Sequence, residues 1–245
     1  MKTAVKLPSI PAGAIGIAKE VGRLFVLVEF ADGRRGYYAR RQLIPVMSSP
    51  EDRSDDVLTP LGLVNAQIPR GSHSCLLPSD EHIAMRSAAR YVAAGMKTGD
   101  TTALSLPRGW RQELECRLKR FGVDMNQALS SKTLLIVSPE DIYLPETSFT
   151  ASQQLEKTAK ILAAIVNQTP KPLRSFGFVG RRHTYPGWWE YEERLTPILK
   201  HLGALCVCCY DHSDWNTAAW RRAENAHSYV IRDGRITAGS LPGEI

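Results

Sequence analysis

From residue 71 to residue 236, short apolar segments alternate with longer segments whose apolar residues recur at helical spacing. The short segments are apolar throughout, which is typical of strands buried on both faces of a parallel sheet. The alternation predicts an α/β domain, in which a mainly parallel sheet carries helices on both faces. We expect strands at 74–77, 102–106, 133–138, 174–179, 204–210 and 229–232, and helices at 81–96, 111–121, 152–167, 188–202 and 217–224.

The first 47 residues contain several short strand-like segments and no helical periodicity, which predicts a separate small β module. Residues 24–30 and 35–40 are rich in aromatic and branched side chains and flank Asp32-Gly33, a strong hairpin signal. Further short strands at 15–19 and 43–46 would complete a small barrel, similar to SH3-like or Tudor-like barrels. Residues 48–70 begin with a polar, acidic stretch that contains prolines, and we interpret them as a linker. The expected organisation is therefore a β module at 1–47, a linker at 48–70 and an α/β domain at 71–245.

The net charge of +6 is unevenly distributed along the chain. Residues 1–50 contain eight Lys or Arg against three acidic residues. Such a surplus is compatible with an anionic partner, either nucleic acid or protein. The candidate contacts are Arg34, Arg35, Arg40 and Arg41. Whether the chain also forms a homo-oligomer is left open by the sequence.

The sequence also indicates the cellular setting. No apolar run approaches the ~20 residues that a membrane-spanning helix needs, and prolines and glycines interrupt the first residues before an apolar signal region forms. The five cysteines are an odd number without the spacing of a disulfide framework. We therefore expect a cytoplasmic protein with reduced thiols and no membrane contact.

Three of the cysteines, Cys206, Cys208 and Cys209, lie close to Asp211 and His212 and raise the question of a metal site. Structural zinc sites favour cysteine pairs with the spacing C-x₂₋₄-C on turns. Here the cysteines lie within an apolar strand, whose alternation sends Cys206 and Cys208 to one face and Cys209 to the other. We expect them to be small core residues, and we expect the chain to hold no metal.

Several short motifs from residue 71 to residue 236 occur in an order that resembles a known family. They are His73-Ser74-Cys75-Leu76 with Asp80-Glu81, Gly95 with Gly99-Asp100, Phe121-Gly122-Val123-Asp124, Ala128-Leu129, Ile142-Tyr143-Leu144 and Phe149, Trp188 with Tyr191-Glu192 and Leu195, Cys209-Tyr210-Asp211, and His227 with Val230-Ile231. Their order and spacing resemble the methanogen/methylotroph sensory domain, a family named after the regulator of dichloromethane dehalogenase.

The resemblance implies a fold related to the RecA/KaiC ATPases and a role in sensing small molecules, often coupled to a DNA-binding or signalling module. Two features depart from the family pattern. A β module stands where relatives carry a helix-turn-helix, and Gly180 is followed by Arg181-Arg182 where relatives often have an acid.

Nucleotide hydrolysis of the RecA/KaiC type requires a phosphate loop, GxxxxGK[ST], whose amides and lysine hold the phosphates. The sequence contains no such run, and the loop at 106–110 lacks the Lys-Ser/Thr pair. We therefore expect neither enzymatic activity nor a cofactor. Nucleotide binding without hydrolysis, through Arg108, Arg181 or Arg182, is left open.

The segment 180–193 is the most unusual part of the chain, because basic and aromatic residues gather where a strand ends and a helix begins. Parallel sheets bind ligands at the edge where the carboxyl ends of their strands lie. Gly180 and Asp211 each follow an apolar strand, so both segments should emerge at this edge. The candidate ligand-binding residues are His73, Arg181, His183, Trp188, Trp189, Tyr210, Asp211 and His227. We expect Trp188 or Trp189 to line a pocket with Tyr210 and Asp211. In the alternative interpretation, the two tryptophans anchor the helix in the core and the arginines are solvated.

These observations favour a sensory or regulatory protein, whose α/β domain binds a small molecule and whose β module relays the signal to a partner. One alternative is an interaction adaptor without a ligand, which binds protein or nucleic acid. The other is a degenerate ATPase-like enzyme.

Overall fold

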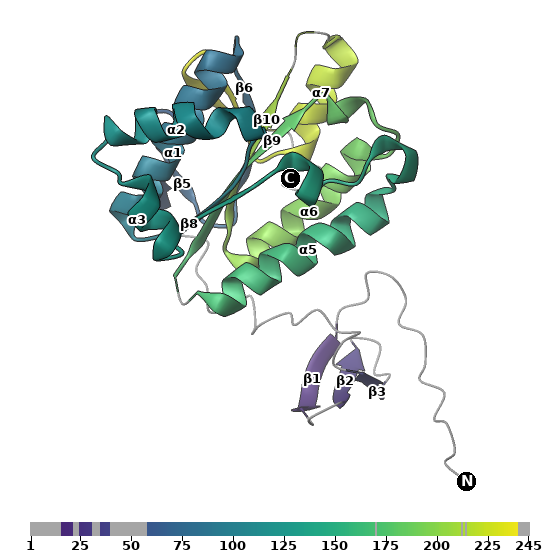
Figure 1. The fold of residues 1–245 in the computed structure, drawn as a ribbon. Helices are drawn as coiled ribbons and strands as arrows, with labels where there is room; N and C mark the ends of the chain where they lie inside the picture. Colours follow the sequence, from purple (N-terminus) through teal and green to yellow (C-terminus); the bar gives the residue numbers. More distant parts are fainter. Residues whose placement is uncertain are drawn as a thin grey trace. The chain divides into compact units, whose positions relative to one another are not determined.

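A computed structural model describes residues 16–21, 25–30, 35–39, 58–169, 171–211, 213 and 215–239 (Figure 1). The chain divides into two units, Met1–Val46 and Met47–Ile245, and each is described by itself. Arg34, Arg40, Arg41, His212 and the strand expected at 43–46 lie outside the described residues.

The N-terminal unit contains an antiparallel sheet in the order β1 (Gly16–Val21), β2 (Phe25–Phe30) and β3 (Arg35–Ala39). β2 and β3 pair from Phe25 opposite Ala39 to Glu29 opposite Arg35, so the two strands around Asp32-Gly33 form the expected antiparallel pair. The SH3-like barrel stays a prediction.

The described residues of the second unit place seven strands in one sheet, in the order β12-β11-β6-β10-β9-β7-β8. All neighbouring pairs are parallel except β11 with β12. This arrangement confirms the predicted α/β class. The bounds in spatial order are β12 (Arg235–Ala238), β11 (Tyr229–Arg232), β6 (His73–Leu77), β10 (Leu205–Tyr210), β9 (Leu173–Gly180), β7 (Thr101–Ser105) and β8 (Leu134–Val137).

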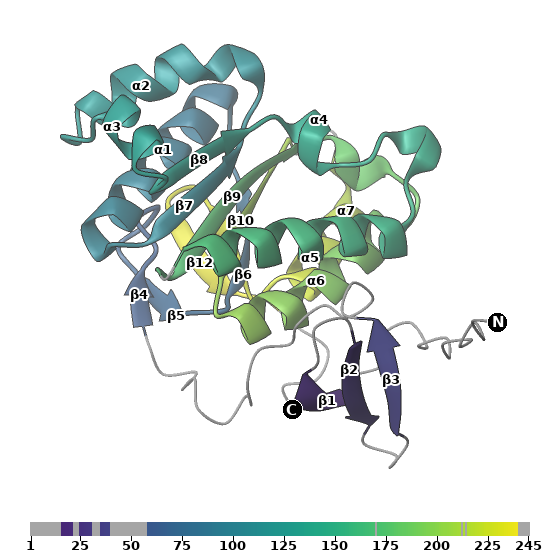
Figure 2. The same ribbon diagram turned by 60° about the horizontal axis from the view of Figure 1, so that its bottom comes forward.

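Helices cover both faces of this sheet (Figures 1 and 2). One layer contains α1 (Glu81–Thr98), α2 (Arg111–Lys119) and α3 (Met125–Ser130), and the other contains α5 (Ala151–Gln168), α6 (Trp188–Leu202) and α7 (Thr217–Ala226). The sheet separates two apolar cores, one on each face. The connections add α4 (Pro139–Ile142) and short 3₁₀ turns at Arg108–Trp110, Glu146–Ser148 and Arg182–Thr184.

The helix ends follow from local sequence. Asp80 begins α1, because its carboxylate accepts the Ile83 amide at 2.7 Å, and Thr150 begins α5 in the same way. Gly203 ends α6 in the left-handed conformation with φ of 59°, which glycine adopts without strain. Among the described residues, no helix combines the length and the apolar character that spanning a membrane requires.

The predicted linker at 48–70 needs a correction. β4 (Leu58–Pro60) and β5 (Gln67–Pro69) pair as an antiparallel hairpin within the second unit. Leu61 and Ile68 are buried against α1 and its neighbours, so 58–70 belongs to the α/β unit and not to a linker. The acids that predicted a linker all lie before residue 58, and the apolar side chains of 58–68 are too few to predict strands by themselves.

A buried ion pair fastens this hairpin to the sheet. The Arg174 guanidinium on β9 lies 2.7 Å from Asp100 and donates to the Pro60 carbonyl at 3.3 Å. Arg70, directly after β5, holds the other Asp100 oxygen at 2.8 Å. The Arg174 and Asp100 side chains are both fully buried, so each depends on the other for charge compensation.

The sheet also extends further than expected. The chain turns at Asp233-Gly234, and β12 then returns antiparallel to β11, with Val230 opposite Thr237. The strand 229–232 is therefore followed by an edge strand, which the sequence analysis did not predict. β12 is short and mostly exposed, so its residues lack the apolar run that identified the other strands.

Candidate functional site

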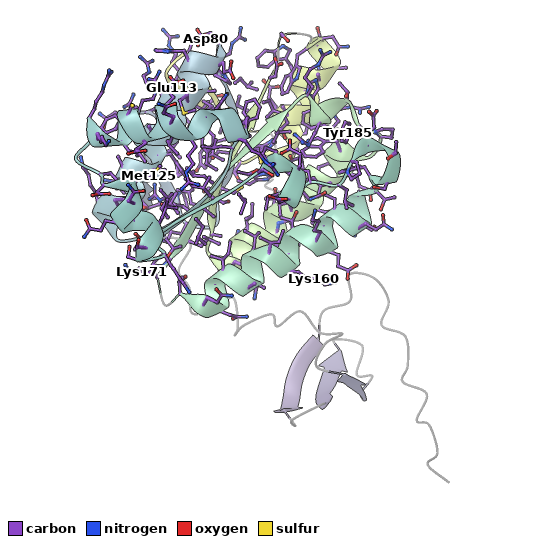
Figure 3. All side chains as sticks on the ribbon, viewed as in Figure 1. Asp80, Glu113, Met125, Lys160, Lys171 and Tyr185 are labelled. Carbon is purple, nitrogen blue, oxygen red and sulfur yellow. The ribbon has the colours of Figure 1, made fainter. Side chains whose placement is uncertain are left out.

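The α6 helix presents a buried charged residue to the sheet, on an otherwise largely apolar face. Trp188, Glu192 and Thr196 follow one another at a spacing of four and therefore share one face of the helix. That face packs on β6 and β10, where Trp188 and Glu192 are completely buried. Figure 3 shows side chains filling the space between the sheet and its helices, whereas the labelled Lys160 and Glu113 lie on the outer surfaces of the two layers.

Glu192 and three residues around its carboxylate form what we call the buried cluster: His73, Glu192, Cys208 and His227. Glu192 Oε2 lies 3.2 Å from His73 Nε2, 3.7 Å from Cys208 Sγ and 3.8 Å from His227 Nε2. Its other oxygen accepts a hydrogen bond of 2.6 Å from the Tyr210 hydroxyl. The four side chains come from β6, α6, β10 and the residues just before β11, so the tertiary fold alone brings them together.

The orientation of His73, the first residue of β6, follows from its hydrogen bonds. The Thr196 hydroxyl donates to the Ala226 carbonyl at 3.1 Å, so its oxygen can accept from His73 Nδ1 at 2.9 Å. His73 Nε2 then faces Glu192, and it lies 3.3 Å from Cys208 Sγ. Thr196 thereby directs the His73 ring into the buried cluster.

His227 is oriented in the same manner. Its Nδ1 lies 2.9 Å from the Ala223 carbonyl, which can only accept, so Nδ1 carries the hydrogen. Its Nε2 therefore carries a lone pair, which faces Glu192 Oε2 and has no hydrogen-bond partner among the described residues. A buried acceptor without a donor is rare in folded proteins.

Burial and charge together set the protonation states. Burial raises the pKa of Glu192, but the hydrogen bond and charge of His73 lower it more, so that it lies below its ordinary value. Burial lowers the pKa of His73, but the hydrogen bond and charge of Glu192 raise it above the ordinary value. Burial and the nearby His73 charge lower the pKa of His227 to about 3. The hydrogen bond with Cys206 and burial raise the pKa of the Cys208 thiol.

A second feature, the aromatic group of Trp189, Tyr210 and Trp215, lies where β9 and β10 end. The Trp189 and Tyr210 rings stack with centroids 5.9 Å apart, and Trp215 meets both edge-on at 5.8 and 5.4 Å. The Asp211 amide donates to the Gly180 carbonyl at 3.1 Å, so both strand ends emerge at the same edge. Trp189 and Tyr210 are buried, and Trp215 is half-buried.

The candidate ligand-binding residues thus fall into separate places. His73 and His227 belong to the buried cluster, and Tyr210 joins the cluster through its hydroxyl and the aromatic group through its ring. His183 lies beside Trp215, with ring centroids 5.2 Å apart.

The other candidates lie around these two features. Trp188 donates to the Tyr210 hydroxyl at 3.3 Å and packs in the core against Phe149. Arg181 is exposed and Asp211 is half-buried. Ligand binding by these residues stays a prediction.

No site role was predicted for Glu192, Cys208, Thr196 or Trp215. Two signals were present for the first two. Glu192 is a charged residue at a position that helical spacing places on the apolar face of α6, and strand alternation places Cys208 on the same face as Cys206. Trp215 lies in an irregular segment, where periodicity carries no information.

The fold defines a three-layer α/β domain with a mainly parallel sheet. The model of the methanogen/methylotroph, DcmR sensory domain matches residues 72–228. The chain belongs to this family, which confirms the resemblance of its motifs and indicates a sensory or regulatory role.

One solved structure similar to the chain is that of a KaiC-like protein from the hyperthermophilic archaeon Pyrococcus horikoshii OT3. The two share 15% sequence identity, and the match covers 69% of this chain and 73% of the other, with a TM-score of 0.48. No curated protein gave a significant sequence match.

Proposed function

We propose that the chain is a sensory protein whose α/β unit binds a small apolar or aromatic molecule against the aromatic group. The N-terminal unit then relays the bound state to a partner. The observation that carries this proposal is the packing of Trp189, Tyr210 and Trp215 at the carboxyl ends of β9 and β10.

The chemistry of these rings suits such a ligand. Aromatic faces supply a large apolar contact area and lose little conformational entropy when a ligand binds. Trp215 is half-buried and precedes α7, whereas Trp189 and Tyr210 form a buried floor beneath it. A small molecule can therefore pack against Trp215 and, through its edge-on contact with Tyr210, displace the Tyr210 ring.

Tyr210 links the aromatic group to the buried cluster, which supports a route for the relay. Its ring stacks on Trp189, and its hydroxyl donates to Glu192 at 2.6 Å. A ligand that shifts the Tyr210 ring thereby changes a hydrogen bond to a buried charge, which a protein registers strongly.

The start of α1 favours sensing over nucleotide hydrolysis. Asp80 caps the helix with its own carboxylate, and Glu81 follows in the first turn, where it accepts a hydrogen bond from the Trp110 indole. In nucleotide-binding proteins of this architecture the helix N-terminus attracts phosphate. Two carboxylates at this position would repel a phosphate.

We propose that the partner binds through basic residues of the N-terminal unit. The basic residues Arg34, Arg35, Arg40 and Arg41 of the N-terminal unit are the contacts we propose for it. Arg35 lies in β3, and the other three lie outside the described residues. Both a nucleic acid and an acidic protein surface fit this charge.

Saturation-transfer NMR tests the ligand proposal, with dichloromethane, cyclohexanol, phenol and toluene as probes. We expect at least one probe to bind, and Trp215→Ala to weaken its binding about tenfold, since lost apolar contact of this size corresponds to about 1–3 kcal/mol. The matched control is Phe121→Ala, which removes an exposed ring after α2. Absence of saturation transfer from all four probes, or equal binding by both variants, would contradict the proposal.

A further inference from the structure

The buried cluster has the composition of a metal site. His73 Nε2, Glu192 Oε2, Cys208 Sγ and His227 Nε2 all lie within 4.8 Å of one another, and each side chain is buried. We propose that these four atoms bind one divalent transition-metal ion in a tetrahedral site, and that the ion is zinc.

The distances among His73, Glu192 and Cys208 are close to those of a tetrahedron around zinc. Zinc bonds of about 2.0–2.1 Å to nitrogen, 2.0–2.2 Å to oxygen and 2.3 Å to sulfur place neighbouring ligand atoms about 3.3–3.6 Å apart. The corresponding distances here are 3.2 Å between His73 and Glu192, 3.3 Å between His73 and Cys208, and 3.7 Å between Cys208 and Glu192. His227 Nε2 lies 3.8 Å from Glu192 Oε2 and within 4.8 Å of the other two ligand atoms, so its side chain would move toward the cluster, by about 1 Å at most, to complete the tetrahedron.

The donor set selects the kind of ion. Imidazole and thiolate groups suit zinc and other late first-row metals, whereas calcium and magnesium require oxygen ligands. Four protein ligands without exposure to solvent are typical of a structural zinc site, in which no position is open to substrate. Zinc in this cluster would join β6, β10, α6 and the residues between α7 and β11.

The groups behind the ligands are arranged as in known metal sites. Thr196 fixes Nδ1 of His73, and the Ala223 carbonyl fixes Nδ1 of His227. The Tyr210 hydroxyl donates a hydrogen bond to Oε1 of Glu192, so that Oε2 faces the other ligands. Such outer partners orient metal ligands and set the tautomers of histidines.

His227 provides an independent argument for an ion. Without an ion, a salt bridge between His73 and Glu192 would balance the buried charges, and the Tyr210 hydroxyl would hydrogen-bond the second Glu192 oxygen. This arrangement would leave the lone pair of His227 Nε2 facing the cluster with no hydrogen-bond donor among the described residues. A metal ion is the partner that this lone pair lacks.

Replacing protons of the buried cluster by a zinc ion would leave its net charge unchanged. Without zinc, His73 donates a proton from Nε2 to Glu192, and the Cys208 thiol points its own proton toward the same carboxylate. Zinc would replace both protons, because its ligands must be a neutral imidazole and a thiolate. One Zn²⁺ enters and two H⁺ leave, so the net charge of the buried cluster does not change and no oxidation is involved.

This proposal replaces the sequence-based expectation that the chain holds no metal. That expectation concerned Cys206, Cys208, Cys209, Asp211 and His212, which are neighbours in sequence. Only Cys208 of these belongs to the buried cluster, and its fellow ligands come from distant segments. The proposal does not depend on ligand binding at the aromatic group.

The test uses the full-length chain, because the buried site should load during folding. The protein is unfolded in urea with EDTA, refolded with ZnCl₂, freed of excess metal and measured by elemental analysis. We expect one zinc per chain in the wild type, and at least a tenfold loss of bound zinc in Cys208→Ser and His227→Gln. The control variants Cys116→Ser and His82→Gln change an exposed cysteine and an exposed histidine and should retain one zinc.

Cobalt provides a second readout that requires no variant to fold. Refolding the wild type with CoCl₂ should give the intense visible bands of tetrahedral Co²⁺ and a thiolate-to-cobalt charge-transfer band in the near ultraviolet. A wild type that retains no stoichiometric zinc, or a cobalt protein without the charge-transfer band, overturns the proposal. Folded ligand variants that bind as much zinc as the controls overturn it equally.

Discussion

The imidazole rings of His73 and His227 lie with their centroids 4.2 Å apart, tilted by 47°, inside the core of the α/β unit. Two rings at this distance cannot both carry a positive charge. The Glu192 carboxylate favours the charge on His73, which lies 3.2 Å away, and burial together with that charge keeps His227 neutral. The state of the whole cluster therefore depends on one buried carboxylate.

Replacement of Glu192 by Gln should destabilise the protein strongly. It leaves His73 without its counter-charge in a fully buried position, and breaking such a pair costs about 3–5 kcal/mol. Urea unfolding in the presence of EDTA measures the effect without a contribution from metal. Glu190→Gln is the matched control, since Glu190 is exposed on the same helix and its pair with Arg194 contributes at most about 1 kcal/mol. Similar unfolding free energies for the two variants would contradict the prediction.

Asp100 should give the stability a specific dependence on acid. Burial raises the pKa of its carboxyl, but the hydrogen bonds from Arg70, Arg174 and Thr98 and the Arg174 charge lower it below the ordinary 3.8. The stabilisation is therefore fully present above pH 3.8 and is lost as the pH falls through the lower, folded value.

The variant Asp100→Asn tests this dependence. We expect a loss of about 3–5 kcal/mol at pH 7 and a flatter decline of unfolding free energy below pH 4, measured by urea unfolding over a pH series. Asp233→Asn changes an exposed aspartate and should behave like the wild type. An unchanged acid profile in Asp100→Asn would argue against the role of the ion pair.

Gly95 on α1 should tolerate no side chain. A Cβ at this position would lie 2.4 Å from Thr102 Oγ1 and 2.8 Å from Arg174 Cδ, both of which are held in place by the core. We expect Gly95→Ala to lower the unfolding free energy by about 1–3 kcal/mol through overpacking. At Gly109 a Cβ would meet no atom within 4 Å, so Gly109→Ala provides the control and should be close to neutral. Thermal unfolding of both variants measures the two changes in stability, and equal stability of Gly95→Ala and Gly109→Ala would contradict the prediction.

Binding of nucleic acid through the N-terminal unit would show a steep dependence on salt, because neutralised phosphates release counterions. We expect the affinity of the full chain for DNA or RNA to fall as salt rises, and alanine at Arg34, Arg35, Arg40 and Arg41 to reduce both the affinity and the slope. Titrations by fluorescence anisotropy at several salt concentrations measure both quantities. If no binding is detected at low salt, a protein partner becomes the better assignment for this unit.

The layers of the fold could be predicted because they depend on local periodicity. The helix expected at 188–202 coincides with α6, and the strand at 204–210 differs from β10 by one residue. β4 and β5 were missed because strands of three residues with prolines carry no periodic signal. Their place in the core depends on Arg174 and Asp100, which are distant in sequence.

The site could be predicted only in part. Strand order and parallel register correctly bring the segments after Gly180 and Tyr210 to one edge. The buried cluster, by contrast, requires the docking angle of α6 on the sheet, which places Glu192 between two histidines. No spacing rule within a single segment contains that information. Glu192 could have been singled out only as a charge on an otherwise apolar helix face.

The wide separation of the cluster residues along the chain also determines at what stage of folding the cluster forms. His73 and Cys208 are 135 positions apart, so bringing them together closes a long loop and carries a large entropic cost. Contacts of this kind form late, after local helices and neighbouring strands. The cluster is therefore assembled only when β6 has paired with β10 and α6 has docked over both. An interaction that is absent from the folding transition state leaves the folding rate unchanged and slows unfolding. The buried charges, and any ion they hold, would therefore slow the unfolding of the α/β unit without changing how fast it folds.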